Sequence, residues 1–169
     1  MSAETSVPEH DWQVGDKAVY PSHGVGEITA IEENELFGTN ARVYVLELLE
    51  SSRRILIPTN KAPQVGLRHV IGGEEASKVL ASLEDEPPPT KPMPWTKRQR
   101  ALVEKLSSGS LFDVAEVLRE LYHLKGMKDL SFGQRRLFDA ATSLLVQELS
   151  IALEKSNDEI EEQIREIFV

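Results

Sequence analysis

Gly72-Gly73-Glu74-Glu75-Ala76-Ser77-Lys78-Val79-Leu80 is the stretch at which the pattern of the chain changes. Before it, short runs of β-branched and aromatic residues alternate with turn residues, which is typical of strands. After it, alanine, valine and leucine recur at helical spacing over residues 74–83, which indicates a first helix. We therefore interpret Gly72-Gly73 as the joint between a β-rich region, 12–72, and a helical region, 73–169. Residues 1–11 are predicted to form a flexible N-terminus.

On the N-terminal side of the joint, four runs are predicted to be strands. They comprise residues 15–21, 27–31, 42–48 and 53–58. Phe37-Gly38-Thr39-Asn40 is the predicted turn of a hairpin between the second and third strands. Several short strands at this spacing favour a small, strongly bent sheet or an SH3/Tudor-like β-barrel, and we take the small barrel as the predicted fold of this region. With the helices that follow, the predicted fold class is α+β.

The second hairpin, residues 42–58, has two possible roles. If it lies at an edge of the sheet, its unpaired backbone groups can pair with a strand of another protein. Adjacent Arg53 and Arg54 would point to opposite faces of a strand, so at most one of them serves a given interface. The alternative is a solvated hairpin tip, and the residues alone leave both open.

On the C-terminal side, four more helices are predicted to complete a compact bundle. They comprise residues 97–106, capped by Thr96; 111–124; 132–155; and a last helix after Ser156. Ser131-Phe132-Gly133-Gln134 and Ser156-Asn157-Asp158-Glu159 match capping boxes. The predicted core face of the second helix carries Ala101, Leu102, Lys105 and Leu106. Glu148 is expected near the edge of an otherwise apolar face.

Pro94-Trp95-Thr96-Lys97-Arg98-Gln99-Arg100 follows an acidic, proline-rich run, and the charge reverses there from negative to positive. A helix that starts at this point would present Trp95 beside cations that can meet phosphate groups. The other interpretation is that Trp95 packs between the proline-rich loop and the bundle, and that the cations form a solvated face.

Composition limits the classes of function. The chain has 169 residues, a net charge of -9, no cysteine and no apolar run long enough to cross a bilayer. The acidic balance argues against non-specific coating of nucleic acid. No phosphate-binding glycine motif, serine nucleophile motif or histidine pair for a metal occurs. We therefore expect a binding protein with no cofactor and no metal, not an enzyme.

Several motifs resemble the CarD/CdnL family, and its CdnL-like members most closely. They are Val14-Gly15-Asp16-Lys17-Ala18-Val19-Tyr20-Pro21-Ser22-His23-Gly24-Val25-Gly26, Ile57-Pro58, Val65-Gly66-Leu67-Arg68, residues 95–100, residues 109–119 and Leu130-Ser131-Phe132-Gly133. The resemblance covers residues 14–168. It implies a bacterial transcription regulator whose N-terminal region binds the β subunit of RNA polymerase. The helical region would contact promoter DNA at the upstream edge of the transcription bubble and stabilise the open complex.

The resemblance also implies particular site residues. Trp95 matches the family's DNA-contacting tryptophan, and Lys97, Arg98 and Arg100 match its basic cluster. Arg54, Leu56, Ile57 and Pro58 match the region that binds the polymerase β subunit. Leu56 stands where some members carry arginine, so the contact there would be more apolar.

Other interpretations come from different classes of protein. A polymerase adaptor of the repair-coupling kind would share the barrel without touching DNA, although it should carry helicase motifs, which this chain lacks. A protein–protein scaffold would leave Trp95 without a role in DNA assays. We expect a cytoplasmic monomer that is associated with the nucleoid through RNA polymerase and has no membrane contact.

Overall fold

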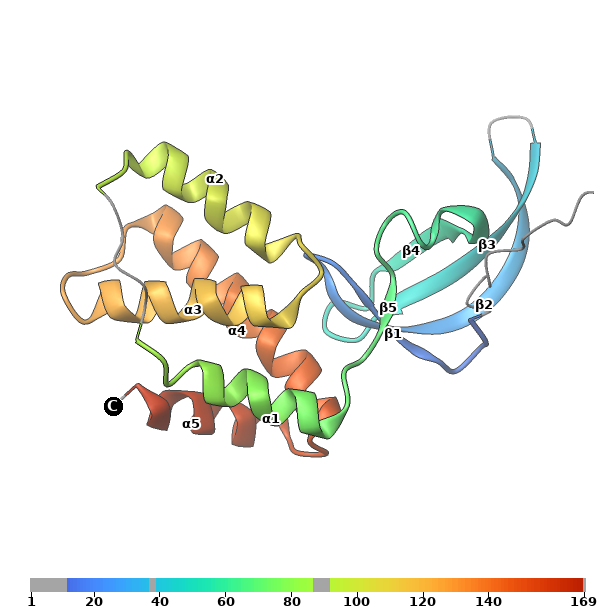
Figure 1. Ribbon diagram of the computed structural model, residues 1–169. Helices are drawn as coiled ribbons and strands as arrows, with labels where there is room; N and C mark the ends of the chain where they lie inside the picture. The colour runs from blue at the N-terminus through green and yellow to red at the C-terminus, as the bar shows by residue number, and fades with distance from the viewer. Residues whose placement is uncertain (1–11, 37–38, 87–91, 169) are drawn as a thin grey trace, which may run out of the picture.

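The computed structural model describes residues 12–36, 39–86 and 92–168 (Figure 1). Within them, strands come first and helices follow, which confirms the α+β prediction. The strands are β1 Lys17–Tyr20, β2 Gly24–Leu36, β3 Thr39–Leu48, β4 Arg54–Pro58 and β5 Arg68–His69, with a short 3-10 helix, Thr59–Lys61, after β4. The helices are α1 Gly73–Ser82, α2 Trp95–Leu106, α3 Leu111–Lys125, α4 Phe132–Ala152 and α5 Asn157–Ile167.

The strands form one antiparallel sheet in the order β4-β3-β2-β1-β5. Among the described residues each outer strand, β4 and β5, pairs with one neighbour, so the sheet is not closed. This agrees with the bent sheet that the sequence allowed, and differs from a fully closed barrel. β2 and β3 form a long ribbon with a register shift between Ile28 and Ala30, which increases its bend. Thr39 and Asn40, which we predicted as turn residues, belong to β3 and pair with residues of β2. Residues 37–38 of that predicted turn lie outside the described residues.

One face of the sheet buries a small core. Ile28 and Leu46 have no exposed surface, and Ile57 is 2% exposed. Trp12 is also buried, with its ring centroid 4.2 Å from that of His69. Trp12 thus ties the start of the described chain to the outer strand β5, a role that we did not predict from the sequence.

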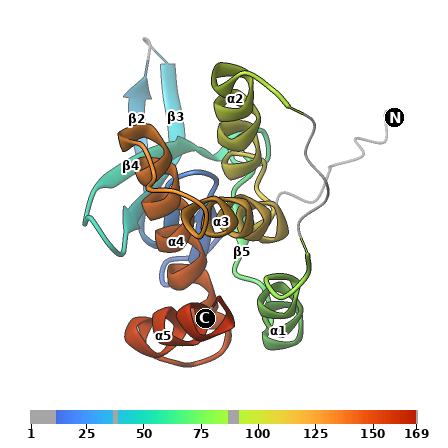
Figure 2. The ribbon, with the colours of Figure 1, turned by 90° about the vertical axis from the view of Figure 1, so that its left-hand side faces the viewer.

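The helices surround α3, as Figure 2 shows in a view along the bundle. Val117, Leu118 and Leu121 on α3 are at most 1% exposed, as their helical spacing predicted. The buried side chains of α3 pack together with those of the other helices, so the bundle has one apolar core. The predicted stripes on α4 and α5 also face this core, with Leu145 and Ile160 completely buried.

Three details of the predicted helices are wrong. Thr96 is not the cap of α2, because the Pro94 carbonyl already accepts the Lys97 and Arg98 amides and the helix therefore begins at Trp95. Ala101 is exposed, since Leu102 and Leu106 occupy the side of α2 that meets the core. The fourth helix ends at Ala152 and not near 155, just before Glu154 takes a left-handed backbone conformation.

Both predicted capping boxes are present, at Ser131 and Ser156. The Ser131 hydroxyl accepts the Gln134 amide at 3.2 Å, and the Gln134 side chain accepts the Ser131 amide at 2.8 Å. We expect Ser131→Ala to lower the free energy of unfolding by about 1 kcal/mol, because it leaves an amide of the first turn unpaired. Urea denaturation measures this loss. Ser110→Ala is the matched control, since Ser110 begins α3 without a side-chain cap; equal losses would contradict the prediction.

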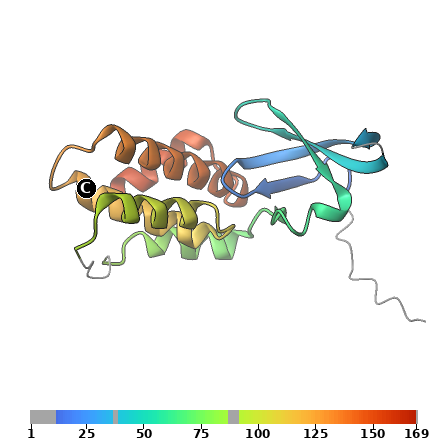
Figure 3. The same cartoon turned by 90° about the horizontal axis from the view of Figure 1, so that it is seen from above.

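The two halves of the molecule lie end to end and meet at α4 (Figure 3). Gln147 accepts the Val25 amide at 3.1 Å and donates to the Glu50 carboxylate. Glu148 binds Arg68 through two hydrogen bonds of 2.6 and 2.7 Å. Glu148 is 1% exposed, so the prediction that it lies near an edge is wrong. The sequence pattern could not show this, because the edge is covered by residues of the sheet half.

Candidate functional site

The first turn of α2 carries the predicted tryptophan. Pro94 precedes the helix and sets its start, since proline fits the N-terminal end of a helix and its carbonyl begins the hydrogen-bond ladder. Trp95 is half-buried and packs against the bundle core. The start of α2 lies at the end of the bundle that is away from the sheet (Figure 1).

The predicted cations differ in how free they are. Arg98 forms an ion pair with Glu120 on α3, with Nη1 3.4 Å from Oε1, and about a quarter of each side chain is exposed. Lys97 and Arg100 are exposed. Neither has an ion pair among the residues that the structure describes. A phosphate group would therefore meet Lys97 and Arg100 directly, but it would compete with Glu120 for Arg98.

Exposed apolar side chains at the same end of the bundle were missed by the sequence reasoning. Phe132, the first residue of α4, is 79% exposed, and Met127 is 73% exposed. The Arg136 guanidinium lies 5.9 Å from the Phe132 ring centroid. A signal for Phe132 was available, because it shares a helical face with Arg136 and not with the buried stripe through Leu137.

The outer edge of β4 carries the other predicted site. β4 pairs with β3 on one side and, within the described residues, has no strand on the other. Arg54 and Leu56 are exposed, Leu56 to 47%, and Pro58 is half-buried. Ile57 is 2% exposed, so its side chain belongs to the sheet core and it can offer a partner only its backbone. Arg53 lies outside the strand.

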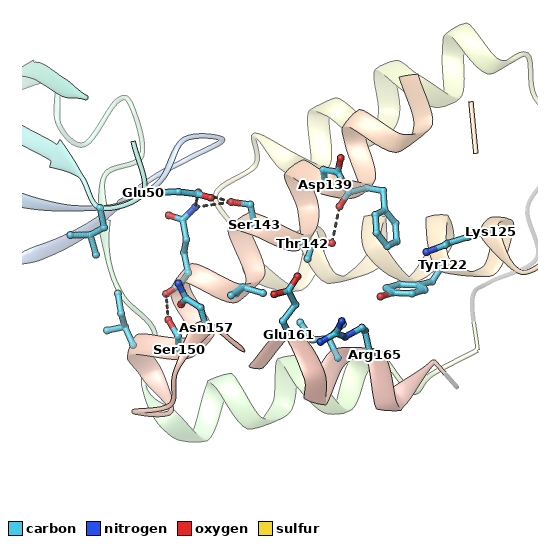
Figure 4. A pocket seen from close by; sticks show the side chains of 16 residues that line it. Glu50, Tyr122, Lys125, Asp139, Thr142, Ser143, Ser150, Asn157, Glu161 and Arg165 are labelled. Atoms are coloured by element: carbon cyan, nitrogen blue, oxygen red, sulfur yellow. Dashed lines mark hydrogen bonds between the residues drawn. The ribbon is translucent and has the colours of Figure 1, made fainter. Parts of the chain in front are cut away.

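A cavity of about 520 Å³ lies between α3, α4, α5 and the β3–β4 turn (Figure 4). Glu50 and Ser143 line one end, while Tyr122, Lys125 and Arg165 line the other. Burial raises the pKa of Tyr122, against an opposing effect of the Arg165 charge. The polar groups at the Glu50 end bind one another. The cavity thus stands apart from both predicted sites.

The described part of the chain contains no group of three or more histidine, aspartate or glutamate side chains that could hold a metal ion. It also contains no helix that is both long and apolar enough to span a membrane. The two predicted surfaces, the β4 edge and the first turn of α2, lie on different halves of the molecule.

Comparison with known proteins gives matches in both halves. Residues 12–71 match the CarD-like/TRCF RID domain, and residues 78–165 match the CarD C-terminal domain. YdeB of Bacillus subtilis (strain 168), which is named as a candidate transcription factor, is 31% identical over 140 residues, 83% of this chain and 91% of its own. A solved structure, CdnLNt from Myxococcus xanthus, is 52% identical and covers 36% of this chain and 84% of its own, with a TM-score of 0.31.

A sheet half of the RID type joined to a CarD helical half defines a transcription factor that interacts with RNA polymerase. The chain belongs to the CarD/CdnL family. Membership agrees with the resemblance that the sequence motifs indicated. It also points to a regulator and not to an enzyme class.

Proposed function

We propose that the protein binds the β subunit of RNA polymerase through the edge of β4 and stabilises the open promoter complex through the first turn of α2. The observation that carries the proposal is the outer edge of β4, which pairs with no strand among the described residues and on which Leu56 is exposed. An added strand would pair with the backbone of this edge, and Leu56 and Arg54 would contact its side chains. Residues 12–72 would then be the polymerase-interacting domain and residues 73–169 the DNA-contacting domain, preceded by residues 1–11.

In this proposal Trp95 acts as an aromatic wedge at the upstream edge of the bubble. An unstacked base step costs roughly a few kcal/mol, and an apolar wedge in the minor groove offsets that cost. Because the step is unstacked only in open DNA, Trp95 would bind the open complex better than closed DNA, and this difference shifts the equilibrium.

Lys97, Arg98 and Arg100 would hold the neighbouring phosphates without reading the bases. Three phosphate contacts give a salt slope of about -3, and two give about -2 while Arg98 stays with Glu120. Such a slope is small, and the net charge of -9 repels DNA. Docking on polymerase supplies the effective concentration that the isolated chain lacks. The protein would thus act as a monomer in the cytoplasm, on the nucleoid, where polymerase is.

The alternative is a polymerase adaptor that does not contact DNA. Two observations favour it: Trp95 packs partly against the bundle core, and Arg98 already has a carboxylate partner. The two proposals share the β4 interface and differ only in whether Trp95 changes promoter opening.

The β4 interface is tested with Leu56→Asp. We expect this variant to bind a purified β-subunit fragment at least about tenfold more weakly, because an apolar contact worth 1.4 kcal/mol or more is replaced by a buried charge. Isothermal titration calorimetry measures the dissociation constant. Val14→Asp is the control, since Val14 is also exposed (62%) but lies outside β4. Equal binding by both variants would rule out this edge as the interface.

A further inference from the structure

Arg68 and Glu148 form a buried link between the two halves of the molecule. Arg68 belongs to β5, and Glu148 lies on α4, 80 residues later. Nη1 and Nη2 of Arg68 donate to Oε2 and Oε1 of Glu148 at 2.6 and 2.7 Å. The Glu148 side chain is 2% exposed and that of Arg68 is 26% exposed. A two-pronged contact of this kind has one favoured geometry, because the guanidinium fork and the carboxylate are both planar.

The same two side chains also bind the backbone between the halves. Nε of Arg68 donates to the Gly109 carbonyl, in the α2–α3 turn, at 2.7 Å. The Ile71 amide, in the segment that leads into α1, donates to Oε2 of Glu148 at 3.0 Å. The pair thus connects β5, the connecting segment, the α2–α3 turn and α4. We call Arg68 and Glu148 the clamp.

The neighbouring residue on α4 strengthens the link. Gln147 accepts the Val25 amide at 3.1 Å, at the start of β2, and Gly24 lies so close that an added Cβ would collide with Gln147. Two successive residues of one helix therefore contact two separate parts of the sheet half. A change in the angle between the sheet and the bundle would therefore require these contacts to break together.

A buried ion pair is a weak source of stability compared with apolar residues of similar volume. The desolvation cost of the Arg68–Glu148 pair is better explained if the pair sets the angle between the two halves of the molecule. We propose that Arg68 and Glu148 are positioning residues that hold the helical half at a fixed angle to the sheet half, so that Trp95 reaches the DNA when β4 is docked on polymerase. The inference rests on the proposed function. A fixed angle raises the effective concentration of Trp95 at the DNA only if the distance from β4 to Trp95 matches the distance from the polymerase contact to the DNA.

The test replaces the clamp with apolar residues that keep its volume, in the double variant Arg68→Met with Glu148→Leu. This choice keeps the protein folded while the directional contact is lost. Glu74→Gln with Lys78→Gln is the matched control, because it removes an exposed ion pair inside α1. The chain has no cysteine, so spin labels can be placed at Glu32→Cys and Glu104→Cys, on exposed sites of β2 and α2.

Distances between the labels report the angle without polymerase. We expect a narrow distribution for the unmodified clamp and for the control, and a shifted or broadened one for the double variant. If the double variant has the same distance distribution as the unmodified protein, Arg68 and Glu148 do not fix the angle. With polymerase, we expect the double variant to keep its affinity for the β-subunit fragment and to shorten the open-complex lifetime about fivefold or more, the lower range of coupling between two sites.

The outcomes separate the two proposals. A broadened distribution with an unchanged open-complex lifetime would overturn the positioning role while leaving the proposed function intact. If the protein with an intact clamp has no effect on the open complex, the proposed function fails and the positioning role fails with it. The spin-label distances would still decide whether the clamp fixes the angle.

Discussion

Trp95→Ala is expected to shorten the lifetime of the open promoter complex by about tenfold or more, with unchanged binding to the polymerase β subunit. The wedge offsets an unstacking cost of roughly a few kcal/mol, and each 1.4 kcal/mol corresponds to a factor of ten. The decay of open complexes after addition of a DNA competitor measures the lifetime. An unchanged lifetime would rule out the wedge and support the adaptor without DNA contact.

Two further variants separate the wedge from a purely structural effect. Trp95 packs against the bundle core, so thermal unfolding must show that the bundle of the alanine variant stays folded. Trp95→Phe keeps an aromatic ring at the start of α2 and should restore most of the lifetime. The chain has only two tryptophans. In a Trp12→Phe background, the fluorescence of Trp95 should therefore change when the open complex forms, and should stay constant if Trp95 does not meet DNA.

Glu148→Ala is expected to lower the free energy of unfolding by about 3 kcal/mol. Removal of one partner from a buried ion pair costs about 3–5 kcal/mol, because it leaves the other charge without compensation. The lower end applies here because the Arg68 side chain is 26% exposed and can regain water. The loss also leaves the Ile71 amide without its acceptor. Urea denaturation followed by circular dichroism measures the change.

Glu74→Ala is the control for this prediction, since Glu74 is 91% exposed and its pair with Lys78 is long, at 4.0 Å. It should change stability by no more than about 0.5 kcal/mol. Arg68→Met with Glu148→Leu should recover most of the loss, because no charge is then left buried. A loss below about 1 kcal/mol for Glu148→Ala would show that Arg68 is solvated and does not depend on its partner.

Local features of the fold were predictable from the sequence. Ser131 and Gln134 are three residues apart, and their capping box depends on nothing beyond the first turn of α4. The stripe through Val117, Leu118 and Leu121 identified the buried face of α3, because helical spacing alone places these side chains together. Thr96 shows the limit of this reasoning, since Pro94 provided an earlier start to α2.

The candidate site was predictable in part. Residues 95–100 stood out by their reversal of charge, and the motifs around them indicated the family. The partners of these residues did not stand out. Arg98 binds Glu120 only because α2 and α3 lie side by side. The Ile57 side chain is buried in the sheet core, while that of its neighbour Leu56 is exposed. Alternation along a strand shows that two faces differ, but packing decides which face is buried.

The sequence by itself determined the order of strands and helices, the apolar faces of the bundle and the family, because each of these depends on residue types at short, regular spacing. The tertiary structure alone decided that the sheet stays open, that Arg98 has a partner and that Glu148 joins the halves instead of lying at an edge. The physical reason is distance along the chain. Arg68 and Glu148 are 80 residues apart, and only the packing of the sheet against α4 brings them together and buries the Glu148 carboxylate.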